Sequence, residues 1–417
     1  MFGSFFGAIA LFASFIEGHT RAVLARVLPP QLFVFIYSAS RSLYLKALGG
    51  GRFGPHDGCY HKTKAMGLVF RNDLANAAGL DKDASLLEFA YRLGAGYAVV
   101  GTVLSEPHGG NVFSMLGGLW SCNVWTPLPG SGAALNSLGL PSKGVDAALA
   151  NIAAFRERHG IAPQQPSSRN RGAGGSGSGD FPIGVSIMGH PAHGADAGKK
   201  LQGVLDCVRK SLPLADFIEI NESCPNVDHG GGGGKDDQGD DDGAHSGQDE
   251  ELAARLRAIV GVRDAAAAGD GRRVPLLVKL GDLGASAGAT VRFLAGLGID
   301  GLVALNTQKD YAAYDGALPP ADRALLAHYT ARYGGGLSGP PIFARSTAQV
   351  AAAAAAVAEQ GLGDTFTVIH VGGVQSEQDV RESRATGAPL RQWYTGLMHA
   401  IATLPTDQVY GKIAASN

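Results

Sequence analysis

The chain has 417 residues, and its 35 Lys and Arg residues nearly balance its 37 Asp and Glu residues, giving a formal net charge of −2. This balance, without a Lys/Arg-rich block, excludes the basic surface that nucleic-acid-binding proteins usually carry and favours a small-molecule partner. The four cysteines form no C-x-x-C pair, so we expect no metal site and no dense disulfide framework.

Residues 1–60 are predicted to form an apolar helical extension. Residues 1–16 carry no charged side chain, but they are shorter than the ~20 apolar residues that cross a bilayer as a helix. Glu17 is the only acidic residue before residue 51, and the basic residues of that stretch are Arg21, Arg26, Arg41 and Lys46. This pattern is typical of an import signal or of helices lying on a membrane, such as the mitochondrial inner membrane or a bacterial membrane. The alternative is a helical cap packed on the rest of the protein.

Residues 61–417 are predicted to form a single barrel domain. Eight short apolar segments alternate with helical patterns and predict parallel strands at 73–79, 97–103, 181–188, 216–223, 274–280, 301–307, 365–373 and 389–396. Eight such units indicate an α/β fold, a (β/α)8 TIM barrel. A doubly wound open sheet is the alternative, but no G-x-G-x-x-G follows the first strand.

Two low-complexity stretches interrupt the barrel sequence, at residues 163–180 and 229–250. Both are rich in Gly, and Ser or Asp dominates much of the remainder. Such residues bury too little apolar area to offset the entropy of an ordered chain, so both stretches are predicted to be disordered surface insertions.

Polar residues follow nearly every predicted strand, at the edge where β/α barrels place their chemistry. Taken singly, each has an ordinary explanation, such as a solvated lysine, a turn-forming Asn or Thr, or a small buried Cys. Lys279, at the end of the apolar segment VPLLVKL, must be paired if it is buried. An anionic flavin is a suitable partner for this ammonium group, and a structural ion pair is the alternative.

Glycine-rich turns follow the last two predicted strands. VGG at 371–373 and YTG at 394–396 match the position where TIM barrels often bind a phosphate, and GGLSG at 335–339 adds a third turn of the same kind.

These motifs together resemble the dihydroorotate dehydrogenase family over most of residues 67–400. FRNDLANAAGLDKD resembles the family's first strand, LNSLGLPSKG its substrate loop and NESCPN its catalytic loop, and LLVKL, VALNTQ, GGLSG, HVGGV and WYTG follow in the family's order. The resemblance implies an FMN-dependent oxidoreductase that oxidises dihydroorotate to orotate in pyrimidine (UMP) biosynthesis.

The resemblance also implies a role for each matching residue. Cys224 would be the base that takes a proton from C5 of dihydroorotate, and Lys82 would stabilise charge as the hydride leaves. The implied substrate residues are Lys82, Asn136, Gly139, Leu140, Asn221, Asn226, Asn306 and Thr307. The implied FMN residues are Ala78, Gly79, Thr102, Ser186, Asn221, Lys279, Ser338, Gly339, Gly372, Gly373, Tyr394 and Thr395.

The sequence combines features of two classes of this family. A cysteine base, NSLGLP, Ser186 and Leu305 are similar to the soluble class 1 enzymes. The apolar extension resembles the membrane-bound class 2 enzymes, which pass electrons to quinone, but the segment GGNVFSMLGGLWS lacks the arginine that class 2 enzymes place near the quinone. Either quinone or fumarate is therefore expected as the acceptor. The remaining alternatives are an FMN barrel acting on another dihydropyrimidine and a non-catalytic, membrane-tethered binding module.

Overall fold

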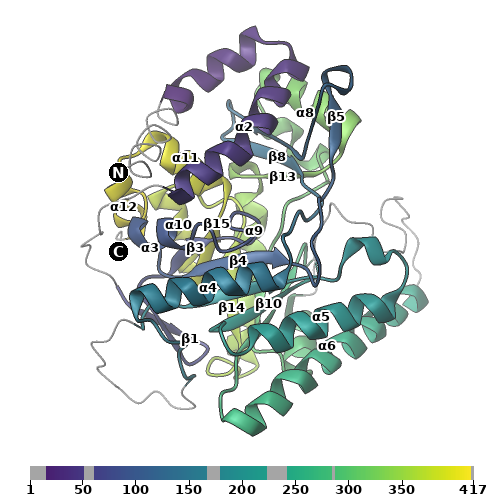
Figure 1. Cartoon of the computed structure of the whole chain (residues 1–417), viewed down its shortest axis with the longest axis vertical. Coiled ribbons are helices and arrows are strands. Elements are labelled where there is room, and N and C mark those ends of the chain that lie inside the picture. The colour runs from purple at the N-terminus through teal and green to yellow at the C-terminus, as the bar shows by residue number, and fades with distance from the viewer. Residues whose placement is uncertain (1–15, 51–60, 167–178, 223–241, 284–286, 415–417) are drawn as a thin grey trace.

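The computed structural model describes residues 16–50, 61–166, 179–222, 242–283 and 287–414. Each of the eight segments predicted as strands contains one strand of a single eight-stranded sheet with parallel pairing (Figure 1). These strands are β3 (Leu74–Asn76), β4 (Ala98–Val103), β9 (Ile183–Ile187), β10 (Phe217–Asn221), β11 (Leu276–Leu280), β12 (Gly301–Ala304), β14 (Thr367–Val371) and β15 (Leu390–Trp393). The predicted barrel is confirmed.

The sheet closes on itself through the segment that follows β3. The strand order is β3-β15-β14-β12-β11-β10-β9-β4, so β3 and β4 are the two ends of the sheet. Gly79 N donates to Gly101 O at 2.6 Å, and Gly101 N donates to Asp81 O at 2.7 Å. The Asn76 side chain adds a bond to Val99 O at 2.7 Å. These contacts join the two ends and rule out the open-sheet alternative.

Helices surround the barrel and bury one apolar face each. In α5 (Ala197–Ser211) the buried positions are Val204, Cys207, Val208 and Ser211, which share one helical face. Its N-cap, Asp196, accepts a hydrogen bond from Lys199 N at 2.9 Å. The other described helices after residue 60 are α3 (Leu87–Leu93), α4 (Val145–His159), α6 (Asp242–Asp270), α7 (Ala287–Gly296), α8 (Pro320–Tyr333), α9 (Phe343–Glu359), α10 (Glu377–Ala385), α11 (Thr395–Thr403) and α12 (Gly411–Ala414).

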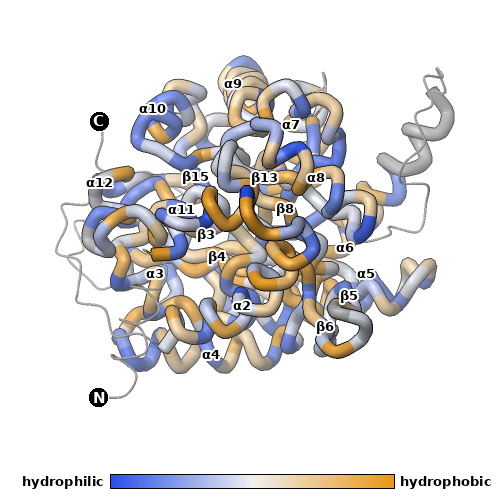
Figure 2. Tube along the Cα trace, turned by 90° about the horizontal axis from the view of Figure 1, so that it is seen from above, coloured by the Kyte–Doolittle hydropathy of each residue, from blue (hydrophilic) through white to orange (hydrophobic). Residues whose placement is uncertain are grey.

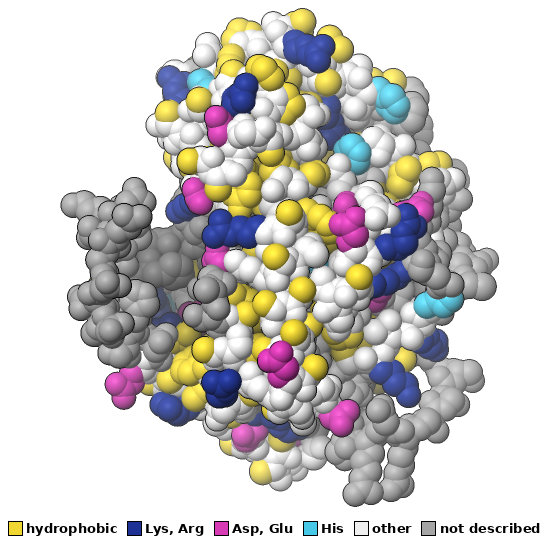
Figure 3. All heavy atoms as spheres, turned by 180° about the vertical axis from the view of Figure 1, so that it is seen from behind, with side chains coloured by type: hydrophobic (Ala, Val, Ile, Leu, Met, Phe, Trp, Pro, Cys, Tyr) yellow, Lys and Arg dark blue, Asp and Glu magenta, His cyan; other side chains and the backbone are white. Residues whose placement is uncertain are grey.

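Hydrophobic stretches are concentrated near the middle of the molecule and hydrophilic ones on outer helices such as α10 (Figure 2). The strands β4, β9, β10, β12 and β14 are buried at every residue, as expected for parallel strands covered on both faces. On the face shown in Figure 3, basic and acidic side chains of the described residues are interspersed. This arrangement agrees with the near-neutral composition.

Smaller antiparallel sheets cover the two ends of the barrel, and the sequence patterns did not predict them. β1 (Thr63–Ala65) pairs with β2 (Leu68–Phe70), and residues of this hairpin pack among side chains of the barrel strands. At the other end, a three-stranded sheet contains β7 (Val124–Leu128), β8 (Ala133–Ser137) and β13 (Gly336–Ser338), with β8 in the centre. A separate hairpin pairs β5 (Phe113–Met115) with β6 (Trp120–Cys122).

The N-terminal extension is helical, as predicted, over residues 16–27 and in α2 (Pro30–Gly50). Phe33, Val34 and Tyr37 of α2 are buried in a cluster with residues of the three-stranded sheet and α8. Ser38 Oγ donates to Trp125 O at 3.0 Å and accepts from Trp125 N at 3.1 Å. In Figure 1, α2 lies beside β8 and α8. Across the described part of the chain, no helix combines the length and the apolar character needed to cross a bilayer.

The two predicted insertions lie partly outside the described residues, at 167–178 and 229–241. Residues 242–250, predicted as disordered, instead form the first part of α6. The strongly helical pattern ELAARLRAIVG follows directly, and extending an existing helix costs much less than nucleating one. At the edge of the first insertion, the Gln164 side chain accepts a hydrogen bond from Val69 N and donates one to Val69 O.

Asp216 provides a test of how the barrel is held to its helices. Its buried carboxylate accepts hydrogen bonds from Arg156 Nη2 at 2.6 Å, Gln164 N at 2.6 Å and Ile183 N at 2.7 Å. Asp216→Ala should lower the free energy of unfolding by about 3–5 kcal/mol, because it leaves the buried Arg156 charge without a partner. Urea-induced unfolding measures this loss.

The control is Asp206→Ala, which removes the exposed ion pair with Arg209. That variant should lose less than about 1 kcal/mol. Equal losses in the two variants would contradict the importance of the buried pair.

Candidate active site

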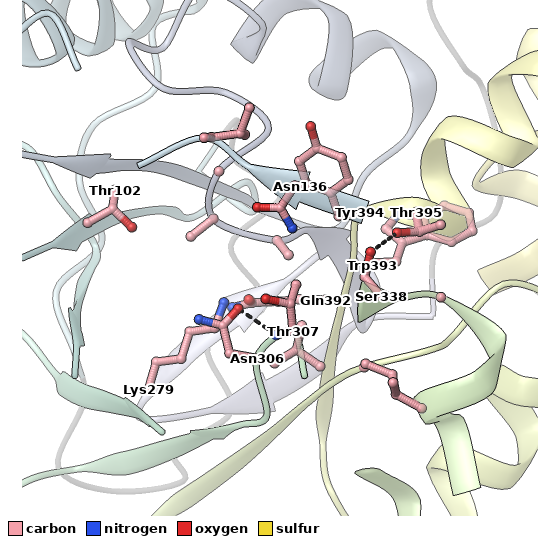
Figure 4. Close-up of a pocket in the computed structure, with 18 of the residues that line it drawn as sticks. Thr102, Asn136, Lys279, Asn306, Thr307, Ser338, Gln392, Trp393, Tyr394 and Thr395 are labelled. Atoms are coloured by element: carbon pink, nitrogen blue, oxygen red, sulfur yellow. Dashed lines mark hydrogen bonds between the residues drawn. The ribbon is translucent and has the colours of Figure 1, made fainter. Parts of the chain in front are cut away.

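A cavity of about 130 Å³, measured as the space open to the centre of a water molecule, lies between the carboxyl ends of the barrel strands and the three-stranded sheet (Figure 4). Nearly all of the residues that the sequence singled out line it, although they come from segments far apart in the chain. They are Ala78, Gly79, Lys82, Thr102, Asn136, Gly139, Leu140, Asn221, Lys279, Asn306, Thr307, Ser338, Gly339, Gly372, Gly373, Tyr394 and Thr395.

Three predicted site residues are not among the described residues that line the cavity. Cys224 and Asn226 lie outside the described residues. Ser186 is fully buried and does not line the cavity. Its hydroxyl lies 3.1 Å from Thr102 Oγ1, so it supports a lining residue from behind. The predicted contact of Ser186 with a ligand therefore becomes an indirect one in this structure.

Several lining residues were missed by the sequence patterns, among them Trp125, Gln392 and Trp393. Trp125 lies on β7, which was not predicted. Gln392 lies inside a segment that was predicted as a strand, and a polar side chain within an apolar strand is the signal that could have identified it. Its Oε1 atom is buried and has no hydrogen-bond partner among the described residues.

A buried hydrogen-bond network fixes the floor of the cavity. Asn221 Nδ2 donates to Thr102 Oγ1 at 3.0 Å, and Ser186 links Thr102 to the Glu219 carboxylate, to which it donates at 2.9 Å. Gln392 Nε2 donates to the other oxygen of Glu219 at 3.3 Å. Since four strands contribute to this network, it holds the Asn221 and Gln392 side chains in fixed orientations.

Lys279 supplies a buried positive charge to the cavity. The residue is 3 % exposed, and it pairs in register with Asn221 of the neighbouring strand. Within the described part of the chain, no carboxylate forms a salt bridge with it, in contrast to the buried arginines Arg156, Arg263 and Arg391. A buried ammonium group requires a compensating negative charge, so this side chain favours an anionic ligand.

Glycine turns and hydroxyl groups form one end of the cavity. Gly373 has φ +81°, and a Cβ atom there would lie 2.6 Å from Phe343 Cα, so no larger residue fits. Ser338 Oγ and Thr395 Oγ1 lie 2.9 Å apart (Figure 4). Thr395 is also the first residue of α11, whose free N–H groups favour an anion. This end has the donors of a phosphate site.

Amide side chains lie nearer the other end. Asn136 on β8 donates to Gly336 O at 3.4 Å, and Asn306, after β12, accepts from Thr307 N at 2.8 Å. The loop with Gly139 and Leu140 continues this wall, and both residues have positive φ angles. Amides offer both donors and acceptors without adding charge, which suits a flat heterocycle with alternating C=O and N–H groups.

The N-terminal extension reaches the same cavity. Arg41 on α2 donates to the Tyr394 hydroxyl at 2.5 Å, and Tyr394 is a lining residue. The two residues are 353 positions apart, so no local pattern could have indicated this contact.

Residues 60–407 match the family model described as dihydroorotate dehydrogenase. This chain belongs to the dihydroorotate dehydrogenase family. The enzymes of this family are oxidoreductases. The chain is 31 % identical over 345 residues to the dihydroorotate dehydrogenase (quinone) of Flavobacterium lutescens, a match that covers 81 % of this chain and 79 % of the relative. It is 30 % identical over 344 residues to the enzyme of the same name from Xanthomonas campestris pv. campestris, with the same coverage.

Solved structures support the fold of this dihydroorotate dehydrogenase family member. A DHODH from Eimeria tenella in complex with ferulenol has a TM-score of 0.64 at 20 % identity, and covers 90 % of both chains. The ligand-free form from the same organism has a TM-score of 0.61 at 21 % identity, covering 93 % of this chain and 97 % of that chain.

Asp81, next to Lys82, provides a test of the loop that carries this lysine. Burial raises the pKa of Asp81 to about 7, and its Oδ1 atom has no partner among the described residues. Since the folded-state pKa exceeds the ordinary value of 3.8, folding takes up a proton between about pH 4 and pH 7, and the stability contribution falls as pH rises through that window. Asp81→Asn should therefore gain stability relative to the parent from pH 4 to pH 7.5, measured by thermal unfolding.

Asp83→Asn is the matched control, because burial raises the pKa of Asp83 but hydrogen bonds from Lys143 and Ser85 outweigh it and lower the pKa. Its stability relative to the parent should instead fall as pH rises. If the Asp81→Asn difference did not change with pH, the assigned protonation would be wrong.

Proposed function

We propose that this protein is an FMN-dependent dihydroorotate dehydrogenase that oxidises dihydroorotate to orotate in pyrimidine (UMP) biosynthesis and passes the electrons to a quinone. The observation that carries the proposal is one cavity at the carboxyl ends of the barrel strands, in a member of this family. Buried Lys279, the half-buried Lys82, the amides of Asn136, Asn221 and Asn306, and a glycine-lined anion site all face it.

The described residues fit FMN. The unbalanced Lys279 ammonium suits the electron-rich edge of a flavin ring, and the unpartnered Gln392 Oε1 suits a ring N–H donor. The turn at Gly372 and Gly373, with Ser338 and Thr395, offers N–H and O–H donors to the phosphate. When bound, FMN would supply the acceptor for the hydride that leaves C6 of dihydroorotate.

The chain itself would supply orientation and proton transfer. The three amides would hold the substrate's C=O and N–H groups by complementary hydrogen bonds, which reduces the entropic cost of reaching the reactive geometry. Lys82 would stabilise negative charge on the ligands. Cys224, three residues after Asn221, would take the C5 proton as thiolate, and nearby positive charge would increase the thiolate fraction.

The proposed acceptor is a quinone at a membrane surface. The bacterial relatives are named as quinone enzymes. Arg41 supplies a basic side chain beside the cavity, in a chain that lacks the arginine expected in GGNVFSMLGGLWS. Large apolar side chains are exposed on the extension and on the β5–β6 hairpin, namely Val23, Val27, Ile36, Leu43, Leu119 and Trp120. Such a surface suits contact with a lipid headgroup layer. Because the extension has few acidic residues, the mitochondrial inner membrane is the membrane we propose.

An anaerobic titration tests the proposal. The purified full chain should carry a bound flavin, dihydroorotate should bleach its absorbance, and a soluble quinone should restore the colour faster than fumarate does. Restoration by fumarate alone would contradict the quinone assignment. A flavin that stays oxidised with dihydroorotate but is bleached by another dihydropyrimidine would contradict the substrate. Absence of bleaching by either compound would favour a binding module.

Cys224 is tested by two substitutions. Cys224→Ala should keep the flavin but slow reduction by dihydroorotate by about 10²–10⁴-fold, the usual contribution of a positioned base. Cys224→Ser should regain activity mainly at higher pH, because a hydroxyl is a weaker acid than a thiol. Stopped-flow absorbance measures both rates, and Cys207→Ala, which alters a buried cysteine of α5, is the control. Full activity in Cys224→Ala would exclude this residue as the base.

A further inference from the structure

A continuous chain of buried side chains runs from Asp73, before β3, to the glycine turn at the anion end of the cavity. Asp73 forms an ion pair with Arg391, and Arg391 Nε donates to Ser383 Oγ at 2.9 Å. Ser383 Oγ lies 2.7 Å from His370 Nδ1, and His370 Nε2 lies 3.0 Å from Ser346 Oγ. Ser346 Oγ then donates to Gly372 O at 2.7 Å.

The hydrogen-bonding capacity of these groups fixes the direction of the chain. Ser346 Oγ bonds the carbonyls of Gly372 and Phe343, which can only accept, so its own proton is used there and it must accept from His370 Nε2. The neutral ring then accepts at Nδ1 from Ser383, whose Oγ accepts from Arg391 Nε. The His370 proton is then on Nε2 and is donated to Ser346. Ser346 is left with one proton, and Gly372 O at 2.7 Å is a closer acceptor than Phe343 O at 2.9 Å.

The charge state of His370 agrees with this direction. Burial, together with the Arg391 charge, lowers its pKa to about 3, so the imidazole is neutral across the physiological range. A neutral imidazole has one donor and one acceptor nitrogen, as the chain requires. The ring also stacks on Phe343 with centroids 5.9 Å apart, which holds its plane beside the turn.

The bond to Gly372 O sets the orientation of the peptide that follows. In a trans peptide the N–H points opposite to the C=O, and the 372–373 bond is not among the cis peptides of the described chain. Because the Gly372 carbonyl points to Ser346, the Gly373 N–H points away from it. Gly373 lines the cavity, and no backbone carbonyl of the described residues accepts its N–H.

We propose that Ser346, oriented by His370, is a positioning residue that holds the Gly372–Gly373 peptide with its N–H directed at the phosphate of the bound flavin. This inference rests on the proposed function. Neither Ser346 nor His370 lines the cavity, so both act through the turn. The consequence is specific to the phosphate: the pair contributes to binding of a phosphorylated flavin and not to binding of the isoalloxazine ring.

FMN and riboflavin, which share the ring but differ in the phosphate, separate these contributions. Dissociation constants for both are measured by flavin fluorescence with the full chain depleted of flavin by dialysis. Ser346→Ala should weaken FMN binding about three- to tenfold, as expected for loss of one hydrogen bond, and leave riboflavin binding unchanged. His370→Leu should act in the same way, whereas His370→Gln, which retains a donor, should keep most of the preference for FMN.

Ser211→Ala is the matched control, because Ser211 is also a fully buried serine and its Oγ has no partner among the described residues. It should leave both constants unchanged. Equal weakening of both flavins in Ser346→Ala, or no weakening of either, would overturn the inference. If Ser346→Ala does not fold, the FMN and riboflavin dissociation constants of His370→Leu and His370→Gln provide the test. A loss of FMN binding in His370→Leu that His370→Gln largely restores would support the inference, and equal weakening of both flavins would overturn it. A parent chain that binds neither flavin would instead overturn the proposed function, and this inference with it.

Discussion

The closure of the barrel between its two end strands, β3 and β4, is the constraint on which the cavity depends. Gly79 and Asp81 bond the backbone of Gly101, so the segment after β3 crosses to β4 and closes the barrel. The same crossing places Lys82 at the cavity wall and brings the strands' carboxyl ends into one ring. A closed ring leaves little room at its centre, and the polar side chains that follow the strands therefore converge.

Buried charges serve two different purposes in this molecule. The Asp216 carboxylate accepts from Arg156 and from backbone N–H groups, and the Asp73 carboxylate pairs with Arg384 and Arg391. Both charges are therefore balanced within the protein and hold elements together. Lys279 is equally buried, but no described carboxylate pairs with it. The contrast agrees with the ligand-binding role proposed for Lys279, because a buried ammonium group requires a compensating negative charge.

The N-terminal extension has features of both a helical cap and an exposed apolar segment, the two interpretations that its sequence left open. One side of α2 packs on the three-stranded sheet, as a helical cap would, and Arg41 reaches Tyr394 at the cavity. Other apolar side chains of the extension are exposed, as expected for contact with a membrane. The helix that packs on the three-stranded sheet therefore also reaches the cavity, while other side chains of the extension leave apolar surface exposed.

The sequence by itself determined the eight strands and most of the cavity residues. Local alternation, buried apolar runs and turn glycines depend on neighbouring residues, and parallel strands must place the polar residues that follow them at one edge. Only the tertiary structure decided which of these residues reach the cavity. It moved Ser186 behind Thr102, added Gln392 and Trp125, and connected Arg41 to Tyr394. It also aligned Asp73, Arg391, Ser383, His370 and Ser346. Such contacts join segments far apart in the chain, and no local pattern encodes the distance between them.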